Sequence, residues 1–189
     1  YECIGCAACI DVCDQVMEKV NLPRGLIRYS TENAMAQHLG KKEILVPYNS
    51  YRLHDPKLKY ANILQKNHVN PDVTRYEPHR VWVVDSVLKP GTSHLYKRRT
   101  LYVDEDSWQI LVVDCYDSRD QLYRVQEGHV IQYYSVPALW TALEVVMDMS
   151  NGRYLALGLD NEEPRSRDFN IKRSTADYQP STLQRRGVR

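Results

Sequence analysis

The fold class is decided by the stretch Arg80-Val81-Trp82-Val83-Val84-Asp85-Ser86-Val87-Leu88. Successive side chains of an extended chain point to opposite faces, so a period of two is typical of a β-strand. The alternation here gives one face with Val81, Val83 and Val87 and an opposite face with Trp82 and Val84. The turn-forming run Lys89–Ser93 follows and ends the pattern. The sequence therefore predicts a strand and a turn at the centre of the chain.

Further strands follow from the same period and from the turn residues between them. We expect strands at Glu43–Tyr48, Arg80–Leu88, His94–Val103, Trp108–Tyr116, Leu122–His129, Trp140–Asp148 and Tyr154–Leu159. The apolar run Trp140–Asp148 also fits a helix, but Asn151-Gly152 follows it, and Asn-Gly between apolar runs is a strong hairpin signal. About six or seven strands at a spacing of roughly 10–14 residues are typical of a sandwich, a barrel or a curved open sheet.

The composition fits a β-rich domain whose net charge does not attract nucleic acid. The 189 residues are 43% hydrophobic and 26% charged, and the formal net charge is only +1. This balance gives no attraction to nucleic acid, so we expect no nucleic-acid partner. Fourteen tyrosines against one phenylalanine favour half-buried sheet faces, where the ring is covered and the hydroxyl stays in water. We find no membrane span and no signal peptide, and a start at Tyr1 predicts a fragment or a processed product.

Four cysteines near the start of the chain form a metal-ligand pattern. The spacing C-x2-C-x2-C-x3-C is made by Cys3, Cys6, Cys9 and Cys13. Zinc sites usually use two separated pairs or histidine partners, so this run favours a [4Fe–4S] cluster over zinc. In two-cluster ferredoxins the fourth cysteine of a run ligates the other cluster. We therefore expect the cluster to be incomplete without a second run, and we interpret Cys115 as a half-buried small residue rather than a ligand.

The change of pattern along the chain divides it into three parts. Residues 1–36 are predicted to be a ferredoxin-type [4Fe–4S] motif fragment with a cysteine loop and a short helix. Residues 37–160 are predicted to be an antiparallel β meander, in which the polar segment Tyr51–Pro71 is mostly loop. Residues 161–189 are polar and rich in arginine, which predicts a tail that lies over the sheet. The first boundary is placed near residues 36–39 because Ala34–Gly40 shows no strong pattern.

The N-terminal part resembles a family of redox accessory proteins. The segments Tyr1–Cys6, Cys13–Met17 and Pro23–Asn33 resemble the second cluster motif of the FixG/CcoG-type cytochrome oxidase accessory proteins. Asp14 stands where ordinary ferredoxins have proline, a change that this family tolerates. The resemblance covers residues 1–35 and implies a parent with a cytoplasmic two-cluster ferredoxin domain on the inner membrane, linked to copper handling for oxidase assembly.

The β-rich part resembles a different family. The segments Pro47–Pro56, Tyr76–Val84, Asp104–Ile110 and Gly158–Glu163 resemble the C-terminal part of the domain-of-unknown-function family 1329, often labelled outer-membrane lipoprotein-sorting proteins. The resemblance implies a periplasmic, curved antiparallel sheet, an incomplete half-barrel of the LolA/LolB kind whose concave face holds an acyl chain or another apolar ligand. Aromatics should line such a face, and the candidates are Trp82, Trp108 and Trp140. The alternative for each of them is an ordinary core aromatic.

Three functions remain open at this stage. The first is a non-enzymatic lipid-binding or hydrophobic-ligand transport domain, fused to an orphan iron–sulfur motif. The second is a [4Fe–4S] electron-transfer protein related to oxidase assembly. The third is an artefactual fusion with no single function, because the two resemblances imply different compartments. These are the periplasm or outer-membrane periphery for the β-rich part and the cytoplasmic side of the inner membrane for the parent of the N-terminal motif.

An enzyme is not expected from these residues. The patterns G-x-S-x-G and H-E-x-x-H and a phosphate loop do not occur in the sequence. The carboxylates Asp104, Glu105 and Asp106 are interpreted as a solvated turn. The six histidines are scattered without metal-ligand spacing, and we expect them on the surface or in hydrogen bonds.

Overall fold

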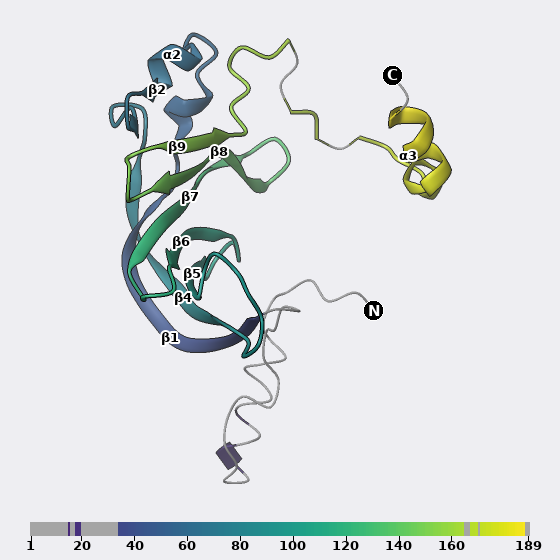
Figure 1. Cartoon of the computed structure of the whole chain (residues 1–189). Coiled ribbons are helices and arrows are strands. Elements are labelled where there is room, and N and C mark those ends of the chain that lie inside the picture. Colours follow the sequence, from purple (N-terminus) through teal and green to yellow (C-terminus); the bar gives the residue numbers. More distant parts are fainter. Residues whose placement is uncertain (1–14, 16–17, 20–33, 165–166, 170, 188–189) are drawn as a thin grey trace.

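The computed structural model describes residues 15, 18–19, 34–164, 167–169 and 171–187 (Figure 1). The predicted cluster ligands Cys3, Cys6, Cys9 and Cys13 lie outside these described residues, as does most of the expected N-terminal fragment. None of the helices in the described ranges is long and apolar enough to cross a membrane.

The described chain is built around one curved sheet of seven strands in which all neighbours are antiparallel (Figure 1). The order across the sheet is β1 (Ala34–Pro47), β4 (Tyr76–Leu88), β5 (Arg98–Asp104), β6 (Ile110–Tyr116), β7 (Leu122–Tyr133), β8 (Ala138–Asp148) and β9 (Tyr154–Leu157). From β4 onward each strand lies beside the next one in sequence, which is a meander. The predicted fold class, a curved antiparallel sheet in a mainly β protein, is confirmed.

Shorter elements lie between β1 and β4 and after β9. The first group is η1 (Tyr51–His54), α2 (Tyr60–Ile63), β2 (Leu64–Gln65) and β3 (His68–Val69), with β2 and β3 forming a separate two-stranded ladder. The second group is η2 (Thr175–Tyr178) and α3 (Pro180–Gly187). The segment that we expected to be mostly loop therefore contains short elements, which buried Leu53 and Ile63 attach to the core.

The first strand differs most from its prediction. It begins at Ala34 instead of Glu43, and it pairs with β4 over the whole length from Ala34 opposite Leu88 to Pro47 opposite Tyr76. The register shifts between His38 and Lys41, where Gly40 has a φ of 101°. Such a bulge interrupts the two-residue period, so the pattern that reveals a strand is lost there. The strand also crosses the boundary that we placed near residues 36–39.

The curvature brings the first strand against strands that are not its neighbours. Val46 of β1 packs with Val81 and Val83 of β4 and with Leu111 and Val130 from β6 and β7, and all five are at most 2% exposed. Just beyond β1, the backbone N–H of Ser50 donates to the carbonyl of Val130 at 3.1 Å. The sheet is therefore curled around this core.

A second core forms where the segment between β1 and β4 covers the other end of the meander. Its buried members are Leu53, Ile63, Val73, Ile131, Ala142, Leu143 and Val145. After β9, the tail begins by lying on the same strands, because the Arg167 guanidinium donates to the carbonyl of Gly158 and the Phe169 ring lies 4.7 Å from that of Tyr133. Both cores thus depend on contacts between residues far apart in sequence.

Truncation of the central leucine tests the curled core. Leu111 is fully buried between strands that the curvature brings together, so Leu111→Ala should lower the free energy of unfolding by about 2–4 kcal/mol. The matched control is Leu155→Ala on the edge strand β9, where the side chain is 55% exposed and the loss should stay below about 1 kcal/mol. Urea unfolding followed by tryptophan fluorescence measures both, and equal losses would contradict the placement of the core.

Candidate functional site

Antiparallel pairing brings four segments together at one end of the sheet: the end of β1, the start of β4 and the two turns β5–β6 and β7–β8. A pocket of about 320 Å³ opens among them. Its lining is mostly polar and consists of Tyr48, Asp106, Ser107, Gln109, Gln132, Pro137 and Leu139. We call this the end pocket.

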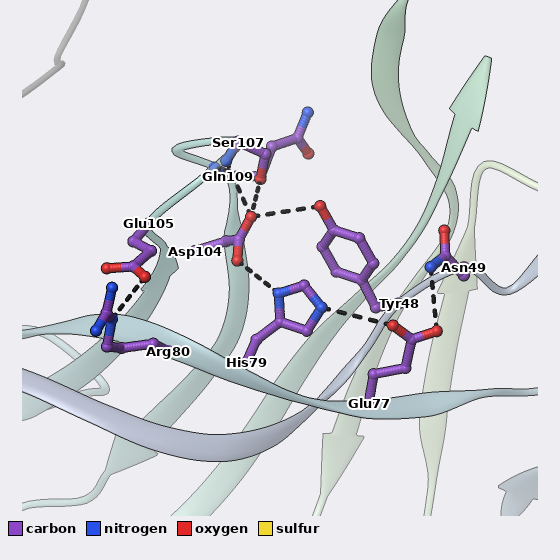
Figure 2. A network of polar contacts seen from close by, with 9 residues as sticks. All are labelled: Tyr48, Asn49, Glu77, His79, Arg80, Asp104, Glu105, Ser107 and Gln109. Carbon is purple, nitrogen blue, oxygen red and sulfur yellow. Dashed lines mark hydrogen bonds and ion pairs between the residues drawn. The ribbon is translucent and has the colours of Figure 1, made fainter. Parts of the chain in front are cut away.

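A buried carboxylate, that of Asp104, contacts the pocket-lining residues Tyr48 and Ser107 (Figure 2). Asp104, the last residue of β5, is 0% exposed, and its Oδ2 accepts hydrogen bonds from the Ser107 backbone N–H at 2.9 Å and from the Ser107 hydroxyl at 2.6 Å. The Tyr48 hydroxyl donates to the same oxygen at 3.4 Å. The other oxygen, Oδ1, lies 3.0 Å from His79 Nδ1. A buried carboxylate needs such partners, because removing its charge from water is otherwise unfavourable.

His79 is fixed on both ring nitrogens and on one ring face. Its Nε2 lies 3.6 Å from Glu77 Oε2, and the Tyr48 ring stacks on the imidazole with 4.0 Å between centroids. Glu77 is held in turn by the Asn49 amide at 3.0 Å and by the Arg75 guanidinium at 2.7 Å. Partial burial alone would raise the pKa of Glu77, but these two partners hold that pKa below its usual value. Glu77 is therefore an anion at neutral pH.

The hydroxyl of the tyrosine beside this pair stays protonated. Burial raises the pKa of Tyr48 to about 12, and the charges of Asp104 and Asp106 act in the same direction. The phenol therefore stays neutral and remains a hydrogen-bond donor to Asp104.

The opposite face of β4 carries two of the three predicted ligand-contacting tryptophans. Trp82 alternates with the buried Val81 and Val83 and so points away from the core. Trp108, in the turn after β5, stacks on Trp82 with 6.1 Å between centroids and an angle of 17°. Its φ of 60° is unusual for a large side chain, and its backbone N–H donates to the carbonyl of Asp104 at 3.0 Å. The turn that buries Asp104 thus also places this indole.

Charged and aliphatic side chains surround the tryptophan pair. The Lys41 ammonium lies 3.9 Å from the Trp82 ring centroid and also bonds to Glu105 at 2.8 Å. Arg80 reaches the other oxygen of Glu105 at 2.6 Å, and these two hydrogen bonds lower the pKa of that carboxyl. The cross-strand row that contains Trp82 continues through Val103 to Ile110, which is 49% exposed. We call Trp82, Trp108 and Ile110 with the flanking Lys41 the outer patch.

The third tryptophan lies apart from the outer patch. Trp140 is 50% exposed near the start of β8, opposite Ile131 of β7, and among the described residues no ring contact joins it to Trp82 or Trp108. The structure therefore brings two of the three predicted residues together and leaves the third on a different part of the sheet. The pair lies on the outside of the sheet, away from the buried valines, and not on the concave face where we expected the aromatics.

The remaining thiol, expected to be half-buried, is more deeply buried than predicted. Cys115 of β6 is fully buried, and burial raises the pKa of its thiol. Such a thiol is a packing residue and a poor metal ligand. The four cysteines of the N-terminal run are outside the described residues, so their role as ligands stays a prediction.

Sequence reasoning missed the polar network beside the end pocket. Asp104 was interpreted as part of a solvated turn, but its carboxylate is buried. The available signal was the serine three residues later, because Asp and Ser at this spacing can close a turn through their side chains. The contribution of His79 comes from β4, and its distance in sequence left no local signal.

The two parts of the chain are similar to different families. The model of the family described as "Protein of unknown function (DUF1329)" matches residues 34–184, and a 4Fe-4S dicluster domain model matches residues 1–32. An uncharacterized protein of Pseudomonas aeruginosa is 53% identical over 150 residues, which are 79% of this chain and 33% of that protein. The chain therefore spans about a third of the length of this relative.

The N-terminal part and the fold have their own relatives. The nitrogen fixation protein FixG of Rhizobium meliloti is 53% identical over 38 residues, which are 20% of this chain and 7% of that protein. A domain from Vibrio parahaemolyticus, provisionally assigned to outer membrane lipoprotein sorting, matches 84% of this chain and 52% of its own with a TM-score of 0.48 at 14% identity. A DUF1329 family protein from Desulfovibrio piger matches 81% and 48% with a TM-score of 0.45 at 13% identity.

Removal of the buried carboxylate tests the network. In Asp104→Ala, the N–H of Ser107, the hydroxyl of Tyr48 and the ring of His79 lose their acceptor, so the free energy of unfolding should fall by about 2–4 kcal/mol. The control Asp106→Asn changes an exposed carboxylate of the same turn and should alter stability by less than about 0.5 kcal/mol. Urea titration of both variants gives the comparison. Similar losses in the two would show that the burial of Asp104 does not matter to the fold.

Proposed function

The chain belongs to the DUF1329 family over residues 34–184. We propose that this part of the chain is a non-enzymatic domain that binds an apolar, lipid-type ligand on the surface of its sheet. The observation that carries the proposal is the stacked pair Trp82 and Trp108 on the outside of a curved sheet. Large aromatics are usually covered in a folded domain, and an exposed apolar patch indicates a binding surface. Trp108 keeps 40% of its surface exposed although its ring is held in place by stacking.

The outer patch has the chemistry of an amphiphile site. The indoles, together with Ile110, offer flat and aliphatic surface to an acyl chain, and each buried CH₂ contributes about 0.8 kcal/mol. The Lys41 ammonium, which lies over the Trp82 ring, offers a donor to a polar head. The indole Nε1 of Trp82 is buried and has no hydrogen-bond partner within the described part of the chain, so it is a donor that an acceptor on a ligand could satisfy.

The polar network beside the end pocket supports the non-enzymatic part of the proposal. The Ser107 hydroxyl donates to Asp104 and makes no hydrogen bond with His79 among the described contacts. A serine nucleophile needs a base in hydrogen-bond reach, and here the imidazole is occupied by two carboxylates instead. The arrangement stabilises a turn and does not resemble a nucleophile–base pair.

We place this function in the periplasm or at the periphery of the outer membrane. The placement rests on the sequence resemblance to the 1329 family given above, and it concerns the β-rich part alone. We infer a different origin for the N-terminal motif, and the separate family matches over residues 1–32 and 34–184 support this. A fusion of two unrelated segments is the account of this chain that we favour.

Truncation of the exposed indole tests the outer patch. Trp108→Ala removes the exposed half of the stack, so affinity for a single-chain fatty-acid amphiphile below its micelle threshold should fall roughly tenfold, or about 1.4 kcal/mol. The matched control is Trp140→Ala, which removes an indole of similar exposure outside the patch and should leave the affinity unchanged. Isothermal titration of the three proteins measures this. The proposal fails if the native chain does not bind, or if both variants lose affinity equally.

Electron transfer is the second candidate function, favoured by the 4Fe-4S dicluster match over residues 1–32. Electron transfer by this motif requires a complete [4Fe–4S] cluster. By the ligand rule of two-cluster ferredoxins, Cys3, Cys6 and Cys9 serve one cluster and Cys13 serves another, so the single run should not complete either.

Anaerobic reconstitution with iron and sulfide separates the two functions. One [4Fe–4S] cluster holds about four iron atoms, and we expect the full chain to retain fewer than that. Its absorbance near about 400 nm should therefore be weak. Cys115→Ser is the control, because this buried thiol should not change the iron content. A full complement of iron that is lost in Cys9→Ser would instead support electron transfer.

A further inference from the structure

The polar network beside the end pocket contains three side chains that the proposed function does not use. One ligand atom each from His79, Asp104 and Asp106 lie within 4.8 Å of one another. We propose that these three side chains bind a divalent metal cation beside the end pocket, where Asp106 is the one of the three that belongs to the pocket lining. This site is on the opposite face of the sheet from the outer patch and does not depend on the binding of an apolar ligand.

The surroundings of His79 already have the form of the outer shell of a metal site. Histidines that bind metals commonly donate their other ring N–H to a carboxylate, which fixes the ring and its tautomer. Here Nε2 faces Glu77 while Nδ1 faces Asp104, and Glu77 is itself held by Asn49 (Figure 2). Arg75 contacts the same carboxylate of Glu77. The stacked Tyr48 ring leaves the imidazole little freedom to rotate. A metal at Nδ1 would therefore meet a ligand that is already oriented.

The carboxylate of Asp104 is also held in a fixed orientation by its hydrogen bonds. Oδ2 of Asp104 accepts hydrogen bonds from Ser107 and Tyr48, whereas Oδ1 lies 3.0 Å from His79 Nδ1. A cation between Nδ1 and Oδ1 would replace that one contact and leave the bonds to Oδ2 intact. Metal–ligand bonds of about 2.0–2.2 Å require only a small inward shift of groups that already lie within 4.8 Å.

The charge at the pocket favours a cation. The carboxylate of Asp106 is exposed and makes no hydrogen bond or ion pair within the described part of the chain. No lysine or arginine is among the residues that line the pocket. Two carboxylates and one neutral imidazole suit divalent ions such as Mn²⁺ and Zn²⁺, and the remaining coordination positions would face the open pocket.

Manganese is the suitable probe because the N-terminal cysteines would bind zinc. Thiolates prefer soft ions, whereas imidazole and carboxylate accept Mn²⁺. We expect the full chain to bind about one Mn²⁺ at total concentrations up to about 1 mM, seen as loss of the electron paramagnetic resonance signal of the free ion. Bound Mn²⁺ should broaden the amide resonances of Ser107 and Leu139 and spare that of Leu155, which lies on the edge strand.

Two carboxylates of one turn provide the variant and its control. Asp106→Asn removes a ligand from an exposed position that makes no other contact, and the affinity for Mn²⁺ should fall by at least about tenfold. Glu105→Gln removes a neighbouring charge that faces Lys41 and Arg80 and should leave the affinity within about twofold. Absence of Mn²⁺ binding by the native chain would overturn the proposal, and so would equal weakening in the two variants. Neither result would bear on the amphiphile titration.

Discussion

The carboxylate of Asp104 is buried, and much of the structure depends on how it is satisfied. A carboxylate away from water costs several kcal/mol unless hydrogen-bond donors surround it. Ser107 supplies two donors from the same turn, while Tyr48 and His79 reach it from beyond β1 and from β4. One side chain therefore joins three segments that are far apart in sequence. This joint lies where the curvature of the sheet brings the end of β1 toward the later strands.

The turn between β5 and β6 carries a binding feature for each face of the sheet. Its backbone places the Trp108 ring on Trp82, because the Trp108 N–H is bonded to the carbonyl of Asp104. Two residues earlier, the Asp106 carboxylate lines the end pocket beside His79. An apolar surface and a negatively charged pocket are thus held by one short connection between β5 and β6. A change in this turn should affect both faces together.

The strands could be predicted from the sequence where the two-residue alternation was unbroken. The start of β1 and the contacts between distant side chains could not. From Arg80 to Leu157 the alternation and the turn residues located every strand of the meander, with Asn151-Gly152 deciding correctly between strand and helix at β8. The start of β1 was missed because the bulge at Gly40 breaks the period. The burial of Asp104 was missed because it depends on His79 and Tyr48, which no local pattern connects to it. Of the predicted tryptophans, two meet because of the turn, and that contact is not visible in sequence spacing.

The central claim is that Trp82 and Trp108 form the surface that an apolar ligand occupies. The chain has three tryptophans, so its indole N–H groups give three signals in a proton–nitrogen correlation spectrum. Addition of a fatty-acid amphiphile below its micelle threshold should shift the signals of Trp82 and Trp108 and leave that of Trp140 in place. Shifts at Trp140 alone, or equal shifts at all three indoles, would contradict this account.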